Sequence, residues 1–273
     1  MKQRPRRRKP SHSRSQRSTH PSNRKRVIKL LNLLNDRFPD YERDQLYSFI
    51  MCSEIWVDGA VVRDPAALVR PDVHVEFAQP RYVSRAGDKL SAALTAWQIP
   101  ATGLVWLDAG ASTGGFTDAL LQAGAAHVHA VDVGYNQLDF RLRVDPRVTV
   151  RERCNVLDVT TTGELDPPPN AAVCDLSFRS LRGVLAHILN LTTNGWGIAL
   201  LKPQFEVATE IRWGRRQDHG LTAGIVDPEL RSEVVAGVVR ELGEEGVSVV
   251  ATMDSPIAGR NGNREVLIHV QRG

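Results

Sequence analysis

The sequence predicts an α/β protein whose main domain is a seven-stranded, mostly parallel sheet covered by helices on both faces. From Arg85 onward, apolar strand-like runs alternate with amphipathic helical stretches, as expected for a parallel sheet. Only residues 254–263 connect the last two runs, which is too short for a helical crossover, so these strands should pair antiparallel at one edge. Before Arg85 the pattern is that of a smaller α+β module.

The elements of the main domain, expected to span residues 81–273, follow from apolar periodicity. Strands are expected at Leu104–Ala109, Val128–Val133, Val148–Arg153, Ala171–Leu176, Gly197–Lys202, Val247–Thr252 and Val266–Gln271. Helices are expected at Lys89–Trp97, Phe116–Ala123, Arg179–Leu191 and Pro228–Glu244. Seven strands with an antiparallel ending resemble a class I (Rossmann-like) methyltransferase.

The smaller module is expected at residues 27–80. Helical spacing at Val27–Leu34 and Glu42–Met51 precedes two short strands around Asp58-Gly59, a dipeptide typical of a hairpin turn, and a strand at Val73–Phe77. The stretch SEIWVDGAVVRDPAALVRPDVHVEF resembles the small S-four-like RNA-binding domain, although Ser53-Glu54 stands where that family usually has a glycine. An unspecialised α+β cap on the larger domain is the alternative.

The net charge of +4 conceals a strong asymmetry along the 273 residues. Residues 1–26 contain eleven Lys or Arg and no Asp or Glu, so the remaining chain has 24 basic and 31 acidic residues, a net charge of −7. The tail has almost no apolar residues and should therefore be disordered by itself. Its charge suits a polyanion, either nucleic acid or a membrane surface.

Composition also limits the class of protein. No run approaches eighteen apolar residues, and no apolar run follows the basic N-terminal stretch, so we expect neither a spanning helix nor a secretory signal. The three cysteines, Cys52, Cys154 and Cys174, lack disulfide-type or metal-type spacing and are interpreted as reduced, buried thiols. These features predict a cytoplasmic protein with no metal and no segment that spans a membrane.

The segment VWLDAGASTGGFTDALL combines an apolar strand, a glycine-rich turn and an amphipathic helix. Such a turn lets the backbone approach a ligand, and the helix offers unpaired N–H groups. Asp132 ends the next strand in HAVDVG, where an acid would accept hydrogen bonds from ribose hydroxyls. A nicotinamide cofactor or a simple tight turn would also explain the loop, whereas the absence of a Gly-Lys-Ser sequence argues against a nucleoside triphosphate.

Four further polar residues occupy places where an α/β domain would gather them. Lys89 opens a helix in SRAGDKL, Asp175 ends a strand in VCDLSF, Lys202 ends a strand in LLKPQFEV, and Glu265 precedes the last strand in NGNREVL. Taken alone, each of these residues could be an ordinary charged side chain in solvent. Asp175 and Lys202 stand out because each follows an apolar strand at the carboxyl edge of the sheet.

Together, SRAGDKL, LDAGASTGGFTDALLQAGAAHVHAVDVGYNQL, DLSFRSL and LKPQFEV resemble the TlyA family of ribosomal RNA cytidine 2′-O-methyltransferases, also called hemolysins, over roughly residues 45–272. That catalytic domain is similar to FtsJ-type methyltransferases. The resemblance implies S-adenosyl-L-methionine as cofactor and ribosomal RNA, 16S or 23S, or ribosomal subunits as partner. It places the family's catalytic tetrad on Lys89, Asp175, Lys202 and Glu265. We assign the cofactor site to Asp108, Gly110, Ser112, Gly114, Gly115, Phe116, Asp132 and Asn155.

The implied reaction is attack of a ribose 2′-hydroxyl on a sulfonium methyl group. A hydroxyl is a poor nucleophile at neutral pH, and a lysine can act as its base where a neighbouring cation and desolvation favour the neutral amine. We assign Lys202 as the base, Asp175 and Glu265 as orienting acids, and Lys89 as the neighbouring cation that positions the substrate. The methyl donor carries its own positive charge, so no metal is required.

The sequence departs from the family after KPQFEV, where a glycine-rich loop is usual. Residues 208–226 are bulkier and include Arg212, Trp213, Arg215 and Arg216, which suit either an RNA contact or an ordinary surface loop. Three other functions remain open: a non-catalytic RNA-binding protein, a membrane-active hemolysin-like protein, and a methyltransferase acting on a small molecule or a protein.

Overall fold

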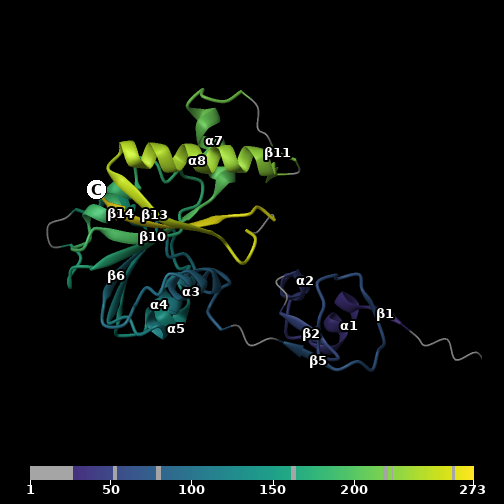
Figure 1. Cartoon of the computed structure of the whole chain (residues 1–273). Helices are drawn as coiled ribbons and strands as arrows, with labels where there is room; N and C mark the ends of the chain where they lie inside the picture. Colours follow the sequence, from purple (N-terminus) through teal and green to yellow (C-terminus); the bar gives the residue numbers. More distant parts are fainter. Residues whose placement is uncertain are drawn as a thin grey trace, which may run out of the picture. The chain divides into compact units, whose positions relative to one another are not determined.

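The computed structural model describes residues 27–51, 54–77, 81–160, 164–217, 221–222, 224–259 and 262–273. The predicted tail and Cys52 lie outside these residues. The chain divides into two compact units, Met1–Gln79 and Pro80–Gly273 (Figure 1). Each unit has its own apolar core.

The first unit packs two helices against a small sheet. Helices α1 (Leu30–Arg37) and α2 (Arg43–Met51) bury Leu30, Leu34, Leu46 and Ile50. The sheet has the order β3-β2-β5, with strands Ala60–Val61, Ile55–Val57 and Val75–Phe77. Asp58 and Gly59 turn the β2–β3 hairpin with positive φ angles, as an Asp-Gly turn favours.

The first helix starts three residues later than its apolar pattern predicts. Residues Ile28–Lys29 form β1 and pair antiparallel with β4, Leu68–Val69, so the chain becomes helical only at Leu30. The expected hairpin and the strand at the end of this unit are both present, and β5 pairs with β2 on the side opposite β3.

The second unit contains the predicted seven-stranded sheet, in the order β13-β14-β10-β9-β6-β7-β8. Its strands are β6 (Val105–Ala109), β7 (His127–Val131), β8 (Val148–Arg151), β9 (Ala171–Cys174), β10 (Trp196–Leu201), β13 (Val247–Asp254) and β14 (Val266–Arg272). The first five pair in parallel, whereas β14 is antiparallel to both β10 and the edge strand β13. This confirms the expected antiparallel ending.

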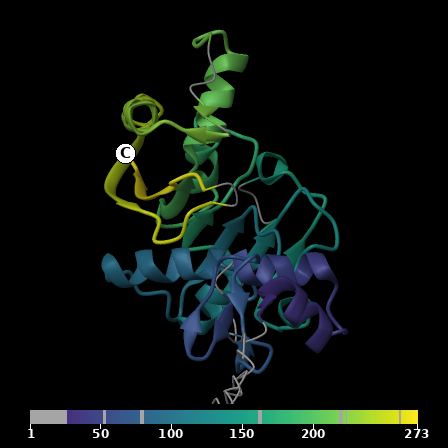
Figure 2. The same ribbon diagram turned by 90° about the vertical axis from the view of Figure 1, so that its right-hand side faces the viewer.

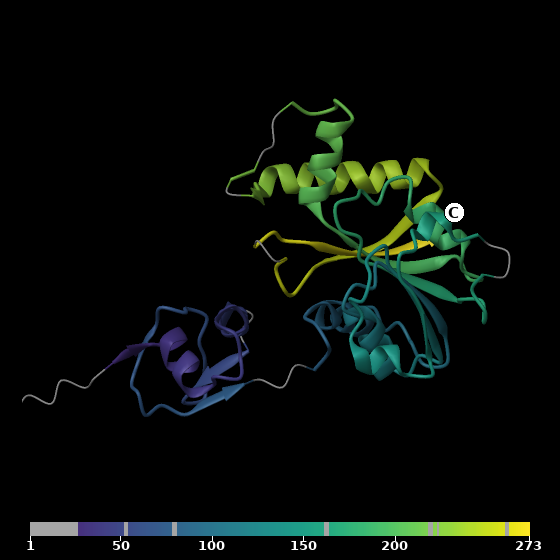
Figure 3. The same cartoon turned by 180° about the vertical axis from the view of Figure 1, so that it is seen from behind.

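Helices cover both faces of this sheet, as seen from opposite sides in Figures 1 and 3. One core lies beneath α3 (Ala86–Ala96) and α4 (Gly115–Gln122), with the short α5 (Phe140–Arg143) packed against it. The other lies beneath α6 (Leu185–Asn190), α7 (Pro203–Arg212) and α8 (Pro228–Glu244). The view in Figure 2 is turned by 90° and looks along α8, which begins at an Asp227 cap followed by Pro228.

Two parts of this layer differ from the expected pattern. The helix predicted at Arg179–Leu191 begins only at Leu185, because Phe178 and Gly183 have φ angles of +62° and +71°, which no α-helix contains. The segment expected as a loop after KPQFEV continues as helix α7 to Arg212. A short pair of strands, β11 (Leu221–Thr222) and β12 (Ile225–Val226), follows α7 and was not predicted.

Candidate active site

The glycine-rich turn lies at the carboxyl end of β6, between the neighbouring strand β9 and helix α5. Gly110 has a φ of +87°, and a Cβ atom there would lie 2.8 Å from the backbone oxygen of Asp175. Gly114 has a φ of +95°, and a Cβ atom there would lie 2.2 Å from Leu142 Cδ1. Only glycine suits both positions, since each needs a left-handed backbone and each is tightly enclosed.

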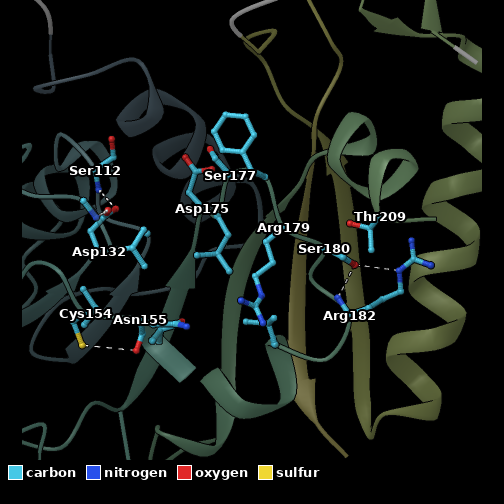
Figure 4. Close-up of a pocket in the computed structure, with 18 of the residues that line it drawn as sticks. Ser112, Asp132, Cys154, Asn155, Asp175, Ser177, Arg179, Ser180, Arg182 and Thr209 are labelled. Carbon is cyan, nitrogen blue, oxygen red and sulfur yellow. Dashed lines mark hydrogen bonds between the residues drawn. The ribbon is translucent and has the colours of Figure 1, made fainter. Parts of the chain in front are cut away.

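A cavity of about 750 Å³, which we call the donor cavity, opens at the ends of β6, β7, β8 and β9. Four of the predicted cofactor residues line it: Gly110, Ser112, Asp132 and Asn155. Figure 4 shows Ser112 and Asp132 side by side on one wall, with Asp175 and Ser177 beyond them. Its volume is within the usual range for small-molecule sites.

The Asp132 carboxylate holds the turn around the donor cavity in place. Its two oxygens accept hydrogen bonds from the backbone N–H groups of Ser112, at 2.8 Å, and Gly134, at 2.6 Å. A second carboxylate, that of Glu152, accepts hydrogen bonds from the N–H groups of residues 136–138 and from Arg143. The Arg143 hydrogen bond, followed by the backbone ones, lowers the pKa of Glu152 to about 2.

The other four predicted cofactor residues, Asp108, Gly114, Gly115 and Phe116, are not among the residues that line the cavity. Asp108 is fully buried beneath the turn, where its Oδ2 accepts a hydrogen bond of 2.6 Å from the Thr117 hydroxyl. Burial raises the pKa of Asp108 to about 7, although the Thr117 hydrogen bond opposes this shift. Asp108 therefore supports the turn from the interior.

A second cavity of about 700 Å³, the acceptor cavity, adjoins the donor cavity. Lys89, Lys202 and Glu265 line it, so the structure brings three of the four tetrad residues to one cavity, while Asp175 lines the donor cavity. Ser112, Ser177 and Phe178 line both. The two cavities thus share a wall, which these three residues form.

The tetrad is arranged as two ion pairs. Lys89 Nζ lies 2.5 Å from Glu265 Oε2, and both side chains are buried. Lys202 Nζ lies 2.7 Å from Asp175 Oδ1 and donates a hydrogen bond of 3.1 Å to Ser177 Oγ. The contact with Asp175 is an ion pair without hydrogen-bond alignment, because Oδ1 has no hydrogen-bond partner within the described structure.

Phe178 was not predicted as a site residue. Its side chain is 80% exposed, its φ is positive, and its ring lies 5.0 Å from that of Phe205 at a tilt of 44°. A large exposed aromatic ring in a backbone conformation that disfavours non-glycine residues is a feature found at functional sites. From the sequence alone, a phenylalanine is expected in the core. The one signal for a role at the site was the position of Phe178 close after Asp175 in DLSF.

The arginines after α7 are mostly bound in ion pairs. Arg215 pairs with Glu241, and Arg216 pairs with Glu210 and Glu233. The guanidinium groups of Arg182 and Arg215 lie 5.2 Å and 4.7 Å from the ring centroid of Trp213, whose ring is nevertheless 46% exposed. An RNA contact by this segment stays a prediction.

The sheet order, the glycine-rich turn after β6 and Asp132 at the end of β7 define a class I (Rossmann-like) methyltransferase domain. Within the described part of the chain, no helix is long and apolar enough to cross a membrane. The same residues contain no group of three or more His, Cys, Asp or Glu that could hold a metal ion.

Comparisons with known proteins agree with this class. A family model of FtsJ-like methyltransferases matches residues 82–272. The chain is 40% identical over 233 residues to the 16S/23S rRNA (cytidine-2'-O)-methyltransferase TlyA of Mycobacterium tuberculosis, covering 83% of each protein. It is 35% identical over 229 residues to hemolysin A of Brachyspira hyodysenteriae, covering 83% of this chain and 92% of that protein. A solved structure of a candidate hemolysin from Streptococcus thermophilus matches with a TM-score of 0.67 and 31% identity, over 90% of this chain and 88% of that one.

The chain belongs to the TlyA family of FtsJ-like methyltransferases. This confirms the family resemblance and the fold class predicted from the sequence. The protein is therefore a methyltransferase enzyme, and its methyl donor is S-adenosylmethionine, the cofactor predicted from the sequence.

Proposed function

We propose that this protein transfers a methyl group from S-adenosylmethionine to the ribose 2′-hydroxyl of a cytidine in ribosomal RNA. Membership in the TlyA family supports the reaction, and the activity named for the Mycobacterium tuberculosis relative supports the substrate. Because ribosomal RNA is found in the cytoplasm, we also expect the protein to act there, without a membrane or a metal.

The observation that carries this proposal is the shared wall between the donor and acceptor cavities. Asp175 lines the donor cavity, and its ion-pair partner Lys202 lines the acceptor cavity. A reactive methyl group on one side and a hydroxyl on the other would therefore meet beside this ion pair. A proton-accepting group at such a junction is what in-line methyl transfer to a hydroxyl requires.

The donor cavity fits the methyl donor. Asp132 and Asn155 lie at the carboxyl ends of neighbouring strands, where a nucleoside is held in this type of fold. When bound, S-adenosylmethionine supplies an electrophilic methyl group on a positively charged sulfur. Because Gly110 has no side chain, the turn that contains Gly110 and Ser112 can lie directly against the end of β9. This position of the turn leaves the cavity open.

In the proposed mechanism, Lys202 reacts as the neutral amine, which forms when the ammonium of its ion pair with Asp175 releases a proton to solvent. Its Nζ then accepts the proton of the ribose hydroxyl. The hydroxyl oxygen forms a bond to the methyl carbon as the carbon–sulfur bond breaks and its electron pair stays on sulfur. The positive charge lost from the sulfonium reappears on the Lys202 ammonium, so the charge of the site is unchanged. Asp175 orients Lys202, Glu265 holds Lys89, and Lys89 is the cation that positions the substrate.

We further propose that residues 27–80 form the RNA-binding domain and residues 81–273 the methyltransferase domain. Two helices followed by a hairpin and a strand, as seen in the first unit, support an S-four-like module. The basic residues 1–26 would add affinity for RNA through phosphate contacts, although they lie outside the described part of the chain.

The test of the mechanism is replacement of Lys202 by Ala and by Arg. General-base contributions are about 10²–10⁴-fold in rate, so Lys202→Ala should lower single-turnover methyl transfer to ribosomal subunits at least about a hundredfold. Lys202→Arg should fail as well, because a guanidinium retains its proton at working pH. As the control for folding, the affinity for S-adenosylmethionine, measured by calorimetry, should change by no more than about threefold.

The position of the label tests the rest of the proposal. Digestion of the methylated RNA to nucleosides should yield a ribose-methylated cytidine. A methyl group on a base, or near-normal turnover by Lys202→Ala, would contradict the proposal.

A further inference from the structure

The donor cavity extends well beyond the turn and the strand ends that would hold the cofactor. Its far wall comes from the segment after β9 and from the end of α7, and comprises Arg179, Ser180, Arg182, Thr209, Arg212 and Trp213. Figure 4 shows Arg179 lying between Asn155 and Arg182, across the cavity from Asp132. We call this part of the cavity the arginine wall.

The arginines of this wall differ in their partners. Arg182 is almost fully buried and is paired with Glu206, Glu210 and Glu241, so its charge is compensated within the protein. Arg179 and Arg212 are exposed, and no carboxylate of the described residues lies within ion-pair distance of either guanidinium. Two uncompensated cations therefore face solvent at the cavity.

No acid lines the arginine wall, since the only carboxylates among the cavity's described lining residues are those of Asp132 and Asp175 on the opposite side. The glutamates that pair with Arg182 are held behind it, between α7 and α8. The surface that a ligand would meet here is accordingly cationic. A guanidinium group binds phosphate through two parallel hydrogen bonds, which suits a polyanion better than a neutral ligand.

The arginine wall is continuous with the acceptor cavity along the chain. Ser177 and Phe178 line both cavities, and Arg179 is the next residue. Phe178 projects outward from the shared wall, with 80% of its side chain exposed. A strand of RNA whose ribose reached Lys202 would therefore pass Phe178 and bring an adjacent phosphate toward Arg179.

From this arrangement we propose that Arg179 and Arg212 form a phosphate-binding subsite for the RNA backbone beside the target nucleotide. The proposal rests on the proposed function, since it assumes that the target nucleotide enters the acceptor cavity. It assigns to these two arginines a positioning role: they hold the strand in register and contribute affinity that depends on salt. Neither arginine takes part in the transfer of the methyl group.

The test is the salt dependence of RNA binding by the full chain, with a 20-nucleotide oligocytidine RNA as the probe. For single strands the slope of log affinity against log salt changes by about 0.7 for each phosphate contact. Arg179→Gln and Arg212→Gln should each make this slope shallower by about 0.7, and the double variant by about 1.4. The matched control is Arg215→Gln, which removes an arginine of the same region that is paired with Glu241 and should leave the slope unchanged.

Calorimetry with S-adenosylmethionine separates this role from cofactor binding. The double variant should bind the cofactor within about twofold of the wild type. An unchanged salt slope in the double variant would contradict the proposed phosphate-binding subsite. A loss of cofactor affinity without a change in the salt slope would contradict it as well. That result would leave the proposed function intact, whereas a wild-type protein that does not bind RNA would contradict the proposed function itself.

Discussion

The close approach of Gly110 to strand β9 leads to a quantitative prediction for Gly110→Ala. The φ of +87° would cost an alanine about 1–2 kcal/mol. The new Cβ would also lie 2.8 Å from the backbone oxygen of Asp175, which cannot turn aside as a flexible side chain would, and such overpacking costs about 1–3 kcal/mol. We therefore expect a loss of about 2–5 kcal/mol in the free energy of unfolding.

The chain offers a matched control in Gly103, in the turn before β6. Its φ is +74°, but a Cβ atom there would have no neighbour within 4 Å. Gly103→Ala should therefore carry only the backbone cost of about 1–2 kcal/mol. The difference between the two variants isolates the contact between the turn and β9.

Urea unfolding and calorimetry with S-adenosylmethionine together measure this difference. If Gly110→Ala relieves the contact by moving the turn into the donor cavity, part of the cost should appear as weaker cofactor binding, by about tenfold for each 1.4 kcal/mol. Gly103→Ala should bind the cofactor as the wild type does. Equal stability and equal cofactor affinity in the two variants would contradict a close contact between Gly110 and the end of β9.

Three further predictions concern side chains around the donor cavity. Asp132→Ala should weaken binding of S-adenosylmethionine by about 1–3 kcal/mol in calorimetry, and unaltered binding would contradict its assigned role. The lowered pKa of Glu152 means that its contribution to stability is complete above its unfolded-state pKa of 4.5 and is lost as the pH falls toward about 2. The thermal unfolding temperature of Glu152→Gln should accordingly fall less over this pH interval than that of the wild type. Parallel curves of unfolding temperature against pH would contradict a stabilising role of the Glu152 carboxylate. Arg182→Met should lower the free energy of urea unfolding by about 3–5 kcal/mol because it leaves Glu206 buried and unpaired, and a loss below about 1 kcal/mol would argue against this.

Much of the sheet could be predicted from the sequence because parallel strands covered on both faces are continuous apolar runs. The strands Ala171–Cys174 and Trp196–Leu201 are of this kind, and both were predicted to within one or two residues. The break before α6 was not predictable in the same way. It depends on a positive φ at Phe178 as well as at Gly183, and a phenylalanine has no intrinsic preference for that conformation.

The cofactor motif predicted the place of the site better than the direction of each side chain. Asp108 is one residue before the end of β6, and in a strand covered on both faces a side chain at that position is buried whichever way it points. Asp132 lies just beyond the end of β7 and so reaches the donor cavity. Two acids that belong to one cofactor motif, Asp108 and Asp132, therefore have different roles, one in the interior and one facing the ligand.

The two ion pairs also bear on the separate roles that the sequence analysis assigned to the two lysines. Lys89 is held against Glu265 in the interior and lines the acceptor cavity but not the donor cavity. Lys202 is the lysine whose partner, Asp175, lines the donor cavity, and it also donates a hydrogen bond to Ser177 in the shared wall. A base must lie within hydrogen-bond reach of the hydroxyl at the place where the hydroxyl meets the methyl group, whereas a positioning cation need only face the substrate. This geometry therefore favours Lys202 as the base and Lys89 as the fixed cation.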